Sequence, residues 1–372
     1  MTEYQVCSRC VMDTTASDIV FDENGVCNYC TTFKKRLSDA REKVQDLQSH
    51  CDEFIAKVKA DGEGKEYDCI VGVSGGVDSS YALHLAVKHG LRPLAVHLDN
   101  GWNSELASNN IANLITSLGV DLYTHVIDWE ENRDLQCSFF KANVVDIELL
   151  MDNAMLALNY QQAAKYRLRN ILSGFNIATE GLSVPPRWNH FKYDARNIRE
   201  IHKLYGSVPI KTFPLFSVMD RVRYGYLGKI KWVSFLDYFP YNKAEALKLL
   251  QREYGYKPYP YKHYESIFTR FYQGYILPKK FGYDKRRVHL STLIMSGQMT
   301  RVEAMKLLED SPYPDPRQEE QDRLFVIKKL GFSEDDFNRY INAAGVPHQE
   351  YGSEKVLWDA FSRVHKLITF RI

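Results

Sequence analysis

A short glycine-containing stretch holds residue types that suit phosphate chemistry. Residues 71–80 read VGVSGGVDSS, in which an apolar run is followed by two glycines, hydroxyls and a carboxylate. The glycines let the backbone turn so that its N–H groups approach phosphate oxygens. Ser79 and Ser80 begin a predicted helix, whose N-terminus favours an anion. The lysine of a Walker loop is absent and Asp78 stands in the loop instead, which indicates Mg²⁺ between a carboxylate and phosphates.

Four cysteines near the start of the chain form a second chemical constellation. They are Cys7, Cys10, Cys27 and Cys30, two CxxC pairs separated by sixteen residues. The spacing predicts a four-thiolate zinc site. Such a site has no open coordination position, so we expect it to order a segment too small to fold alone. An iron–sulfur cluster is the chemical alternative.

Alternating strands and helices are predicted to position the residues of the glycine stretch. The patterns predict strands at 67–74, 92–101, 122–128 and 170–175, with helices at 79–90, 105–119 and 149–169 between them. This alternation predicts an α/β fold with a parallel sheet covered by helices on both faces. Ligands of such sheets bind beyond the carboxyl ends of the strands. We expect a cysteine segment with a helical linker at 1–60, an ATP domain at 61–235 and a mainly helical substrate or partner region at 236–372.

A basic and aromatic segment occupies residues 252–287. It contains nine Lys and Arg against three Asp and Glu, and eleven Tyr and Phe. Aromatic faces with cations suit a nucleic acid or a nucleotide-sugar equally. A helical surface with packed tyrosines and snorkelling lysines explains the same composition. The candidate substrate residues are Glu265, Lys279, Lys280, Asp284, Lys285 and Arg286.

The SGGVDSS stretch resembles the pyrophosphatase loop of the N-type ATP pyrophosphatases, which have an adenine nucleotide α-hydrolase-like fold. The resemblance implies that the loop holds the pyrophosphate released when ATP is cleaved between its α and β phosphates. In SGFNIATEG, residues 173–181, Glu180 follows Gly174 by six positions and resembles the second signature of that superfamily. The implied catalytic residues are Asp78, Ser79 and Glu180, with Asp78 and Glu180 as magnesium ligands. The implied ATP-binding residues are Val73, Ser74, Gly75, Gly76, Val77, Asp78, Ser79, Ser80, Val96, His97, Leu98 and Gly174.

Longer stretches resemble the N-acetyl sugar amidotransferase family of bacterial surface glycan synthesis. They read CSRCVMDTT…GVCNYC, SGGVDSSY, HLDNGWNSELA, DYFPYNK and ESIFTRFYQGYILPKKFGYDKRRVHLS. The resemblance implies that ATP activates the acetamido oxygen of a nucleotide-linked sugar and that ammonia then replaces it, giving an acetamidino group, AMP and pyrophosphate. It also implies that a separate glutaminase, like the subunit of imidazole-glycerol-phosphate synthase, delivers the ammonia.

Composition limits the remaining alternatives. The 372 residues have a formal net charge of +1, so no global field draws the protein to nucleic acid or an anionic membrane. No apolar run is long enough for a transmembrane helix and no signal peptide is present, so we expect a cytoplasmic protein. The main alternative is a tRNA-modifying enzyme that uses the same adenylation, and a zinc-ribbon binding module on a degenerate scaffold ranks third.

Overall fold

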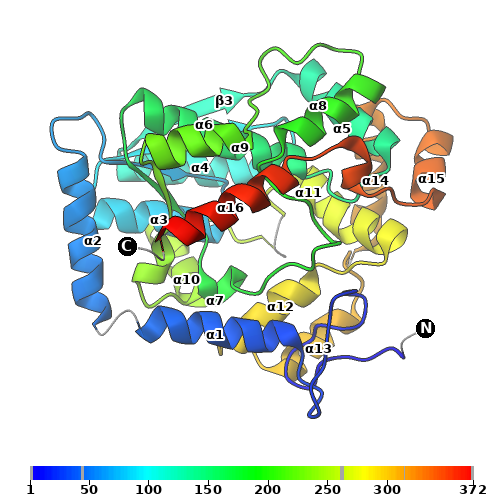
Figure 1. The fold of residues 1–372 in the computed structure, drawn as a ribbon, viewed down its shortest axis with the longest axis horizontal. Coiled ribbons are helices and arrows are strands. Elements are labelled where there is room, and N and C mark those ends of the chain that lie inside the picture. The colour runs from blue at the N-terminus through cyan, green and yellow to red at the C-terminus, as the bar shows by residue number, and fades with distance from the viewer. Residues whose placement is uncertain (1–2, 43–45, 260–263, 314, 370–372) are drawn as a thin grey trace.

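A parallel sheet forms the centre of the protein (Figure 1). The computed structural model describes residues 3–42, 46–259, 264–313 and 315–369. Five strands lie in the order β3-β2-β1-β4-β5, and every neighbouring pair is parallel. The strands are β1 (Cys69–Gly72), β2 (Pro93–Asp99), β3 (Asp121–Val126), β4 (Asn170–Ser173) and β5 (Lys231–Ser234).

Helices cover both faces of this sheet. Successive side chains of a strand point to opposite faces, so Val71 and Ala95 pack into one hydrophobic cluster while Ile70 and Leu94 pack into another. The first cluster includes side chains of α2 (Leu47–Asp61), α3 (Val77–Lys88) and α4 (Glu105–Leu118), and the second includes side chains of α6 (Leu149–Lys165). The expected α/β class, with a parallel sheet between helical layers, is confirmed.

Near the N-terminus, the cysteine segment lies with helices from distant parts of the chain. Figure 1 shows α1, α12 and α13 together at the bottom of the view, beside the first residues of the chain. The helices are α1 (Asn28–Glu42), α7 (Ile177–Glu180), α12 (Arg286–Met295) and α13 (Arg301–Glu309). Because α12 packs on α1, α7 and α13, it connects the cysteine segment to the loop after β4.

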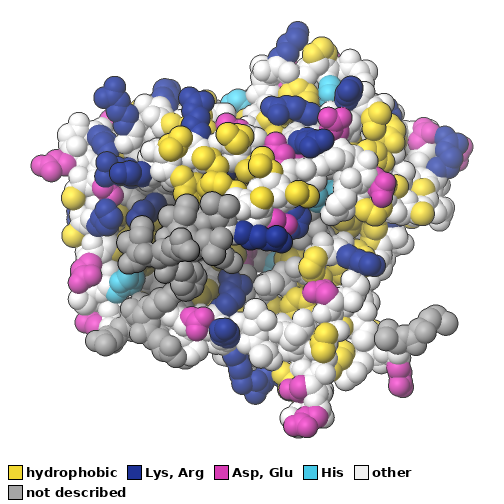
Figure 2. All heavy atoms as spheres, in the orientation of Figure 1, with side chains coloured by type: hydrophobic (Ala, Val, Ile, Leu, Met, Phe, Trp, Pro, Cys, Tyr) yellow, Lys and Arg dark blue, Asp and Glu magenta, His cyan; other side chains and the backbone are white. Residues whose placement is uncertain are grey.

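The surface in this orientation mixes charges of both signs. Figure 2 shows basic and acidic side chains over the visible face. This agrees with the formal net charge of +1. Within the part of the chain that the structure describes, no helix has the length and apolarity needed to span a membrane.

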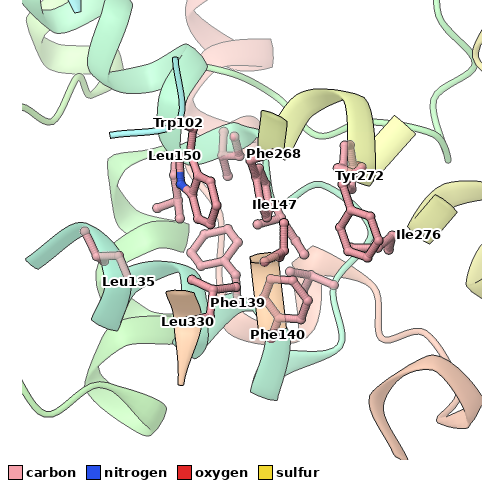
Figure 3. Packing of buried hydrophobic residues seen from close by; sticks show 14 of the residues in the cluster. Trp102, Leu135, Phe139, Phe140, Ile147, Leu150, Phe268, Tyr272, Ile276 and Leu330 are labelled. Atoms are coloured by element: carbon pink, nitrogen blue, oxygen red, sulfur yellow. The ribbon is translucent and has the colours of Figure 1, made fainter. Parts of the chain in front are cut away.

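The largest hydrophobic cluster joins the middle of the chain to its C-terminal part (Figure 3). Trp102, which follows β2, packs against Phe268 with ring centroids 5.3 Å apart, and Phe139 and Phe140 of α5 lie in the same cluster. The remaining helices are α5 (Trp129–Ala142), α8 (Ala195–Tyr205), α9 (Val218–Asp220), η1 (Arg221–Leu227), η2 (Phe235–Tyr238), α10 (Lys243–Tyr254), α11 (Ile267–Phe271), η3 (Tyr272–Phe281), α14 (Pro316–Leu330), α15 (Glu334–Asn342), η4 (His348–Tyr351) and α16 (Lys355–Thr369).

Several elements differ from the sequence-based expectations. The edge strand β5 was not expected, and the helix expected at 149–169 ends at Lys165. The hydrophobic clusters also cross both expected domain boundaries. Ile55 of α2 shares a cluster with β1 and with Leu250 of α10, so the 60/61 and 235/236 divisions do not separate independent cores.

Candidate active site and metal centre

The candidate phosphate loop, residues 73–76, connects β1 to α3 at the carboxyl end of the central strand. Gly75 has a φ of 81°, a conformation that favours glycine, and a Cβ there would lie 3.1 Å from the carbonyl oxygen of Ala107. The hydroxyl oxygens of Ser74 and Ser79 lie 3.1 Å apart, and the Ser74 N–H donates to Ser79 Oγ at 3.2 Å. The loop is therefore held in its turn by its own hydrogen bonds.

The N-terminus of α3 offers backbone donors to an anion. Gly76 is the N-cap residue and provides no side-chain cap, so no side chain from the cap satisfies the first N–H groups. A phosphate at this end would accept those hydrogen bonds and interact with the helix dipole. Val73 and Ser80 are buried and Val77 packs against the core, so these three residues can reach a nucleotide only through their backbone.

Asp78 is held by two residues of the DYFPYNK stretch, residues 237–243, that were not among the expected site residues. Tyr241 Oη donates a short hydrogen bond to one carboxylate oxygen of Asp78, and Lys243 Nζ lies 3.5 Å from the other. Burial, and then the charge of Asp78, raise the pKa of Tyr241 well above its usual value, so its hydroxyl stays protonated and donates. Lys243, at the start of α10, places a cation beside the loop. The loop itself contains no lysine.

Two further tyrosines fix the Gly75 peptide. The hydroxyls of Tyr256 and Tyr259 donate to the Gly75 carbonyl at 2.8 and 3.0 Å. The segment that carries them is fastened to α4, because the Asn110 side chain accepts from the Lys257 N–H and donates to the Lys257 carbonyl, both at 2.9 Å. The aromatic segment thus supports the loop, although its residues 260–263 lie outside the described part of the chain.

The loop after β4 lies directly against the phosphate loop. A Cβ at Gly174 would lie 2.6 Å from the backbone nitrogen of Ser79 and 2.7 Å from the carbonyl carbon of Asp78. Real Cβ atoms essentially never approach this closely, so glycine is required for the backbones to meet. The two stretches predicted to form one site are therefore adjacent.

Glu180 is the last residue of α7, which follows the loop that contains Gly174. Burial, then Asp78 and, to a smaller extent, the charge of Glu180 raise the pKa of Tyr241 above its usual value. Asp237 accepts from the Ile177 N–H at 2.8 Å and ties α7 to the stretch that carries Tyr241. Carboxylate oxygens are the ligands Mg²⁺ prefers, so Asp78 and Glu180 fit a magnesium ion.

Side chains at and just after the end of β2 hold the phosphate loop in place through hydrogen bonds. The Asn103 side-chain amide donates to His97 Nε2 at 3.0 Å, so His97 Nδ1 bears the proton and donates to the Val73 carbonyl at 2.9 Å. Both imidazole nitrogens are therefore engaged within the protein. Val96 is buried against the α6 layer, and Leu98 is partly buried. Contact between an adenine base and these residues remains an expectation.

Two of the candidate substrate lysines have structural partners. Lys279 forms an ion pair with Glu319 at 2.7 Å on the surface. Lys280 Nζ donates to Asn143 Oδ1 at 3.0 Å and to the Ala343 carbonyl at 2.7 Å, just past the end of α15. These contacts fasten η3 to neighbouring helices.

Asp284 and Arg286 also support the fold. They form an ion pair at 2.8 Å, and Arg286 Nη1 donates to the carbonyls of Leu307 and Asp310 at 3.1 and 3.0 Å. A cation here satisfies carbonyls at the C-terminus of α13. We therefore do not assign these two residues to substrate binding.

Glu265 and Lys285 lie beside loops at the carboxyl end of the sheet. The Glu265 carbonyl accepts from the Ser104 N–H at 2.9 Å, beside the loop that follows β2. Lys285 Nζ lies 3.6 Å from a carboxylate oxygen of Glu148, at the start of α6.

The four N-terminal cysteines converge on one point. All are fully buried, and their sulfur atoms lie within 4.8 Å of one another. The Sγ separations are 3.9 Å for Cys7 and Cys30, 3.7 Å for Cys10 and Cys27, and 3.8 Å for Cys27 and Cys30. Four thiolates at about 2.3 Å from a tetrahedral zinc lie about 3.8 Å apart. The donor set therefore fits a single zinc ion, and it is too compact to span a cluster of several irons.

The cysteine segment is clamped onto the C-terminal part of the chain. Arg301 donates to the carbonyls of Cys7 and Cys10, at 3.0 Å from Nη2 and Nε respectively. Arg287 forms an ion pair at 2.9 Å with the buried Asp13. The metal centre therefore positions α12 and α13 as well as its own loops.

Parts of the chain are similar to known proteins. An uncharacterized protein of Methanocaldococcus jannaschii is 31% identical over 118 residues, or 31% of this chain and 40% of that protein. The chain thus spans about 40% of the length of the curated relative it matches. The NMN synthetase of Francisella tularensis aligns over 59% of this chain and 99% of its own, at 18% identity and a TM-score of 0.29. The NH3-dependent NAD synthetase of Campylobacter jejuni, in complex with nitrate, aligns over 56% and 85%, at 14% identity and a TM-score of 0.30. Residues 265–365 match the family model described as LPS biosynthesis protein WbpG-like, C-terminal domain, so this part of the chain is similar to that domain.

Proposed function

We propose that the protein is an ATP-dependent, AMP-forming amidotransferase that converts an acetamido group of a nucleotide-linked sugar to an acetamidino group in bacterial surface polysaccharide (O-antigen) synthesis. One observation carries the proposal: the glycine loop with Asp78 packs against the loop that leads to Glu180, at the carboxyl end of a parallel sheet, in a chain whose C-terminal part is similar to a WbpG-like domain. The first feature supports ATP cleavage, and the second supports a glycan substrate.

The reaction divides into two balanced steps. The acetamido oxygen attacks the α-phosphorus of ATP, the bond to the bridging oxygen breaks, and pyrophosphate leaves with its electron pair. Ammonia then adds to the carbon of the O-adenylyl imidate, and AMP leaves with the former amide oxygen, giving a protonated amidine. An amide is a poor electrophile, so this activation is the step that needs ATP.

The residues around the loop supply positioning and charge. The α3 N-terminus and Ser79 would hold the β and γ phosphates, and Lys243 would stabilise the negative charge of the departing pyrophosphate. Mg²⁺, held by Asp78 and Glu180, would supply Lewis-acid stabilisation of the same charge. Asp78 would then exchange its hydrogen bond from Tyr241 for the metal ion.

The ammonia source is part of the proposal. Free ammonia is scarce at neutral pH, so we propose that a separate glutaminase, like the subunit of imidazole-glycerol-phosphate synthase, delivers it. Purified protein alone should then use ammonium at raised pH but not glutamine.

The alternative of a tRNA-modifying enzyme has less support. A sulfur carrier needs an activated thiolate, but burial raises the pKa of Cys137 to about 11, and its S–H lies 3.4 Å from the Leu330 carbonyl. The formal net charge of +1 also provides no global field that would draw the protein to an RNA backbone.

The test is a mass-spectrometric assay with ATP, Mg²⁺, ammonium and a panel of UDP-linked acetamido and diacetamido sugars. AMP and pyrophosphate should form with one sugar, whose mass should fall by the difference between oxygen and NH. A heavy-oxygen label in the acetamido group should appear in AMP. If no sugar reacts but bulk tRNA provokes AMP release, the RNA enzyme replaces this proposal.

A further inference from the structure

A solvent-open cavity of about 570 Å³ lies beside the edge strand β3. Its walls come from β3, α6, α8 and the loop that follows α8. None of its lining residues belongs to the phosphate loop, to the partners of Asp78 or to residues 265–365. Its polar lining residues are His125, Gln161, Arg199, His202, Lys211 and Thr212.

The topology separates this cavity from the ATP loop. His125 is the second-to-last residue of β3, and Tyr123, two residues earlier, packs with side chains of the α6 layer, so His125 points to the same face of the sheet. Because β2 lies between β3 and β1, the strand that carries the phosphate loop is roughly 10 Å away, at about 4.8 Å per strand. Figure 1 shows β3, α6 and α8 in the upper part of the view and α7 and α10 in the lower part.

Two cations of the cavity have no partner in the protein. Arg199 and Lys211 are exposed, and neither forms an ion pair or a side-chain hydrogen bond within the part of the chain that the structure describes. No Asp or Glu lines the cavity. The two positive charges come from different elements, α8 and the following loop, and they line one cavity.

Two carboxylates of α5 hold the wall of the cavity instead of its cations. Glu131 accepts from the backbone N–H groups of residues 211–213 at 2.9–3.0 Å. Burial opposes the ionisation of Glu131, but these hydrogen bonds hold its pKa below the usual value. Asp134 accepts from the Ser207 N–H at 2.9 Å and lies 3.2 Å from His202 Nε2. The loop that carries Lys211 is therefore fixed before any ligand binds.

Charge and size select the class of ligand. Two cations with no lining carboxylate fit an anion, and the planar guanidinium of an arginine matches the oxygens of a phosphate. A phosphate group carries up to two negative charges and can meet both cations, whereas a carboxylate carries one. A cavity of about 570 Å³ has the size of a small-molecule site.

We propose that this cavity binds the phosphate or diphosphate group of a small molecule, with Arg199 and Lys211 as the contacting cations and Gln161 as a hydrogen-bond donor. The site is additional to the ATP loop, and the inference does not depend on the proposed reaction. A nucleotide and free inorganic pyrophosphate share this chemistry, so the experiment includes both.

The test is calorimetry on the full chain, with the ATP loop first saturated by a non-hydrolysable ATP analogue and Mg²⁺. Pyrophosphate, UDP and uridine are then titrated into wild type, Arg199→Met and Lys211→Met. The wild type should bind pyrophosphate or UDP but not uridine, and each variant should bind roughly ten- to hundred-fold more weakly, the effect of losing a charged hydrogen bond. Lys203→Met is the matched control, because Lys203 is exposed on the same helix but does not line the cavity. It should bind as the wild type does.

The outcomes separate the two sources and the two claims. Tighter binding of UDP indicates a nucleotide ligand and tighter binding of pyrophosphate a free anion, and both support the site if Arg199→Met weakens them. If the analogue itself fills the cavity, two molecules should bind per wild-type chain and Arg199→Met should lose one. Equal binding in wild type and in both folded variants overturns the inference, as does a wild type that binds neither anion and only one analogue. A wild type that never forms AMP refutes the proposed reaction and leaves Arg199-dependent binding intact.

Discussion

Gly174→Ala tests whether the close contact between the two loops positions the chemistry. The added Cβ would lie 2.6 Å from Ser79 N, 2.7 Å from the Asp78 carbonyl carbon and 2.8 Å from Ser79 Cα. Ordinary contact begins at 3.4 Å, so the backbones must separate by about 0.8 Å (3.4 − 2.6). None of the three atoms is the flexible end of a side chain, so the displacement must move the loop or the start of α3.

The expected costs differ for stability and catalysis. Overpacking of this kind destabilises by about 1–3 kcal/mol, which corresponds to a fall in melting temperature of roughly 2–10 °C for a chain of this size. A misplacement of about 1 Å near reacting groups costs on the order of 100-fold in rate. Pyrophosphate release with the sugar that wild type uses should therefore fall by about two orders of magnitude in a folded protein.

A substitution at a second glycine separates the effect on stability from the effect on catalysis. Gly119→Ala, at the C-cap of α4, forces an alanine into a φ of 62° with no atom within 4 Å of the new Cβ. It should cost about 1–2 kcal/mol through backbone strain alone and leave the rate of AMP formation unchanged. If Gly174→Ala lost no more activity than Gly119→Ala at the same loss of stability, the contact would be a packing feature, and our account of the site would be wrong.

Three further predictions concern other parts of the molecule. Lys243→Met should raise KM for ATP and lower kcat, by roughly ten-fold or more in kcat/KM for a lost charged contact, whereas Lys248→Met, on the exposed side of the same helix, should change neither. Cys27→Ser should lower zinc content and melting temperature before any effect on chemistry, and a stable variant with full zinc would remove the structural metal claim. Burial, then the charge of His190, lowers the pKa of His348 to about 3, so the unfolded state binds more protons between about pH 6.5 and 3 and stability should fall as pH falls across this window. The decrease in the free energy of unfolding is at most roughly 5 kcal/mol. It should be smaller in His348→Gln than in the wild type when unfolding is measured from pH 7 to 4.

Local patterns predicted the parts of the site that depend on local geometry. A glycine pair after an apolar run and two CxxC pairs impose their geometry within a few residues, and the structure places both as expected. The partners of Asp78 were missed because Tyr241 is 163 residues away in the chain and contacts it only after α10 packs against α3. The strand β5 was missed because Lys231–Ser234 is a four-residue edge whose strand conformation depends on pairing with β4.

Charge alone also misdirected the choice of substrate residues. Lys280 and Arg286 come from a basic segment, yet both satisfy carbonyls near helix C-termini, a need that no sequence pattern reveals. Lys285, from the same segment, has no such carbonyl and lies 3.6 Å from Glu148. Whether a cation supports the fold depends on the partners that it meets in the packed structure, which the sequence does not define.

The four-cysteine cluster and the loop after β4 are connected through one helix. Arg301, at the start of α13, donates to the carbonyls of Cys7 and Cys10, and α13 packs on α12. Because α12 packs on α1 and also on α7, which ends at Glu180, one helix contacts both the cysteine segment and that loop. The cysteines lie in a hydrophobic cluster with Leu182, Trp188 and Val288, so residues from distant parts of the chain enclose them. A zinc ion held here would therefore stabilise the packing beside α7, although the site has no open position for chemistry.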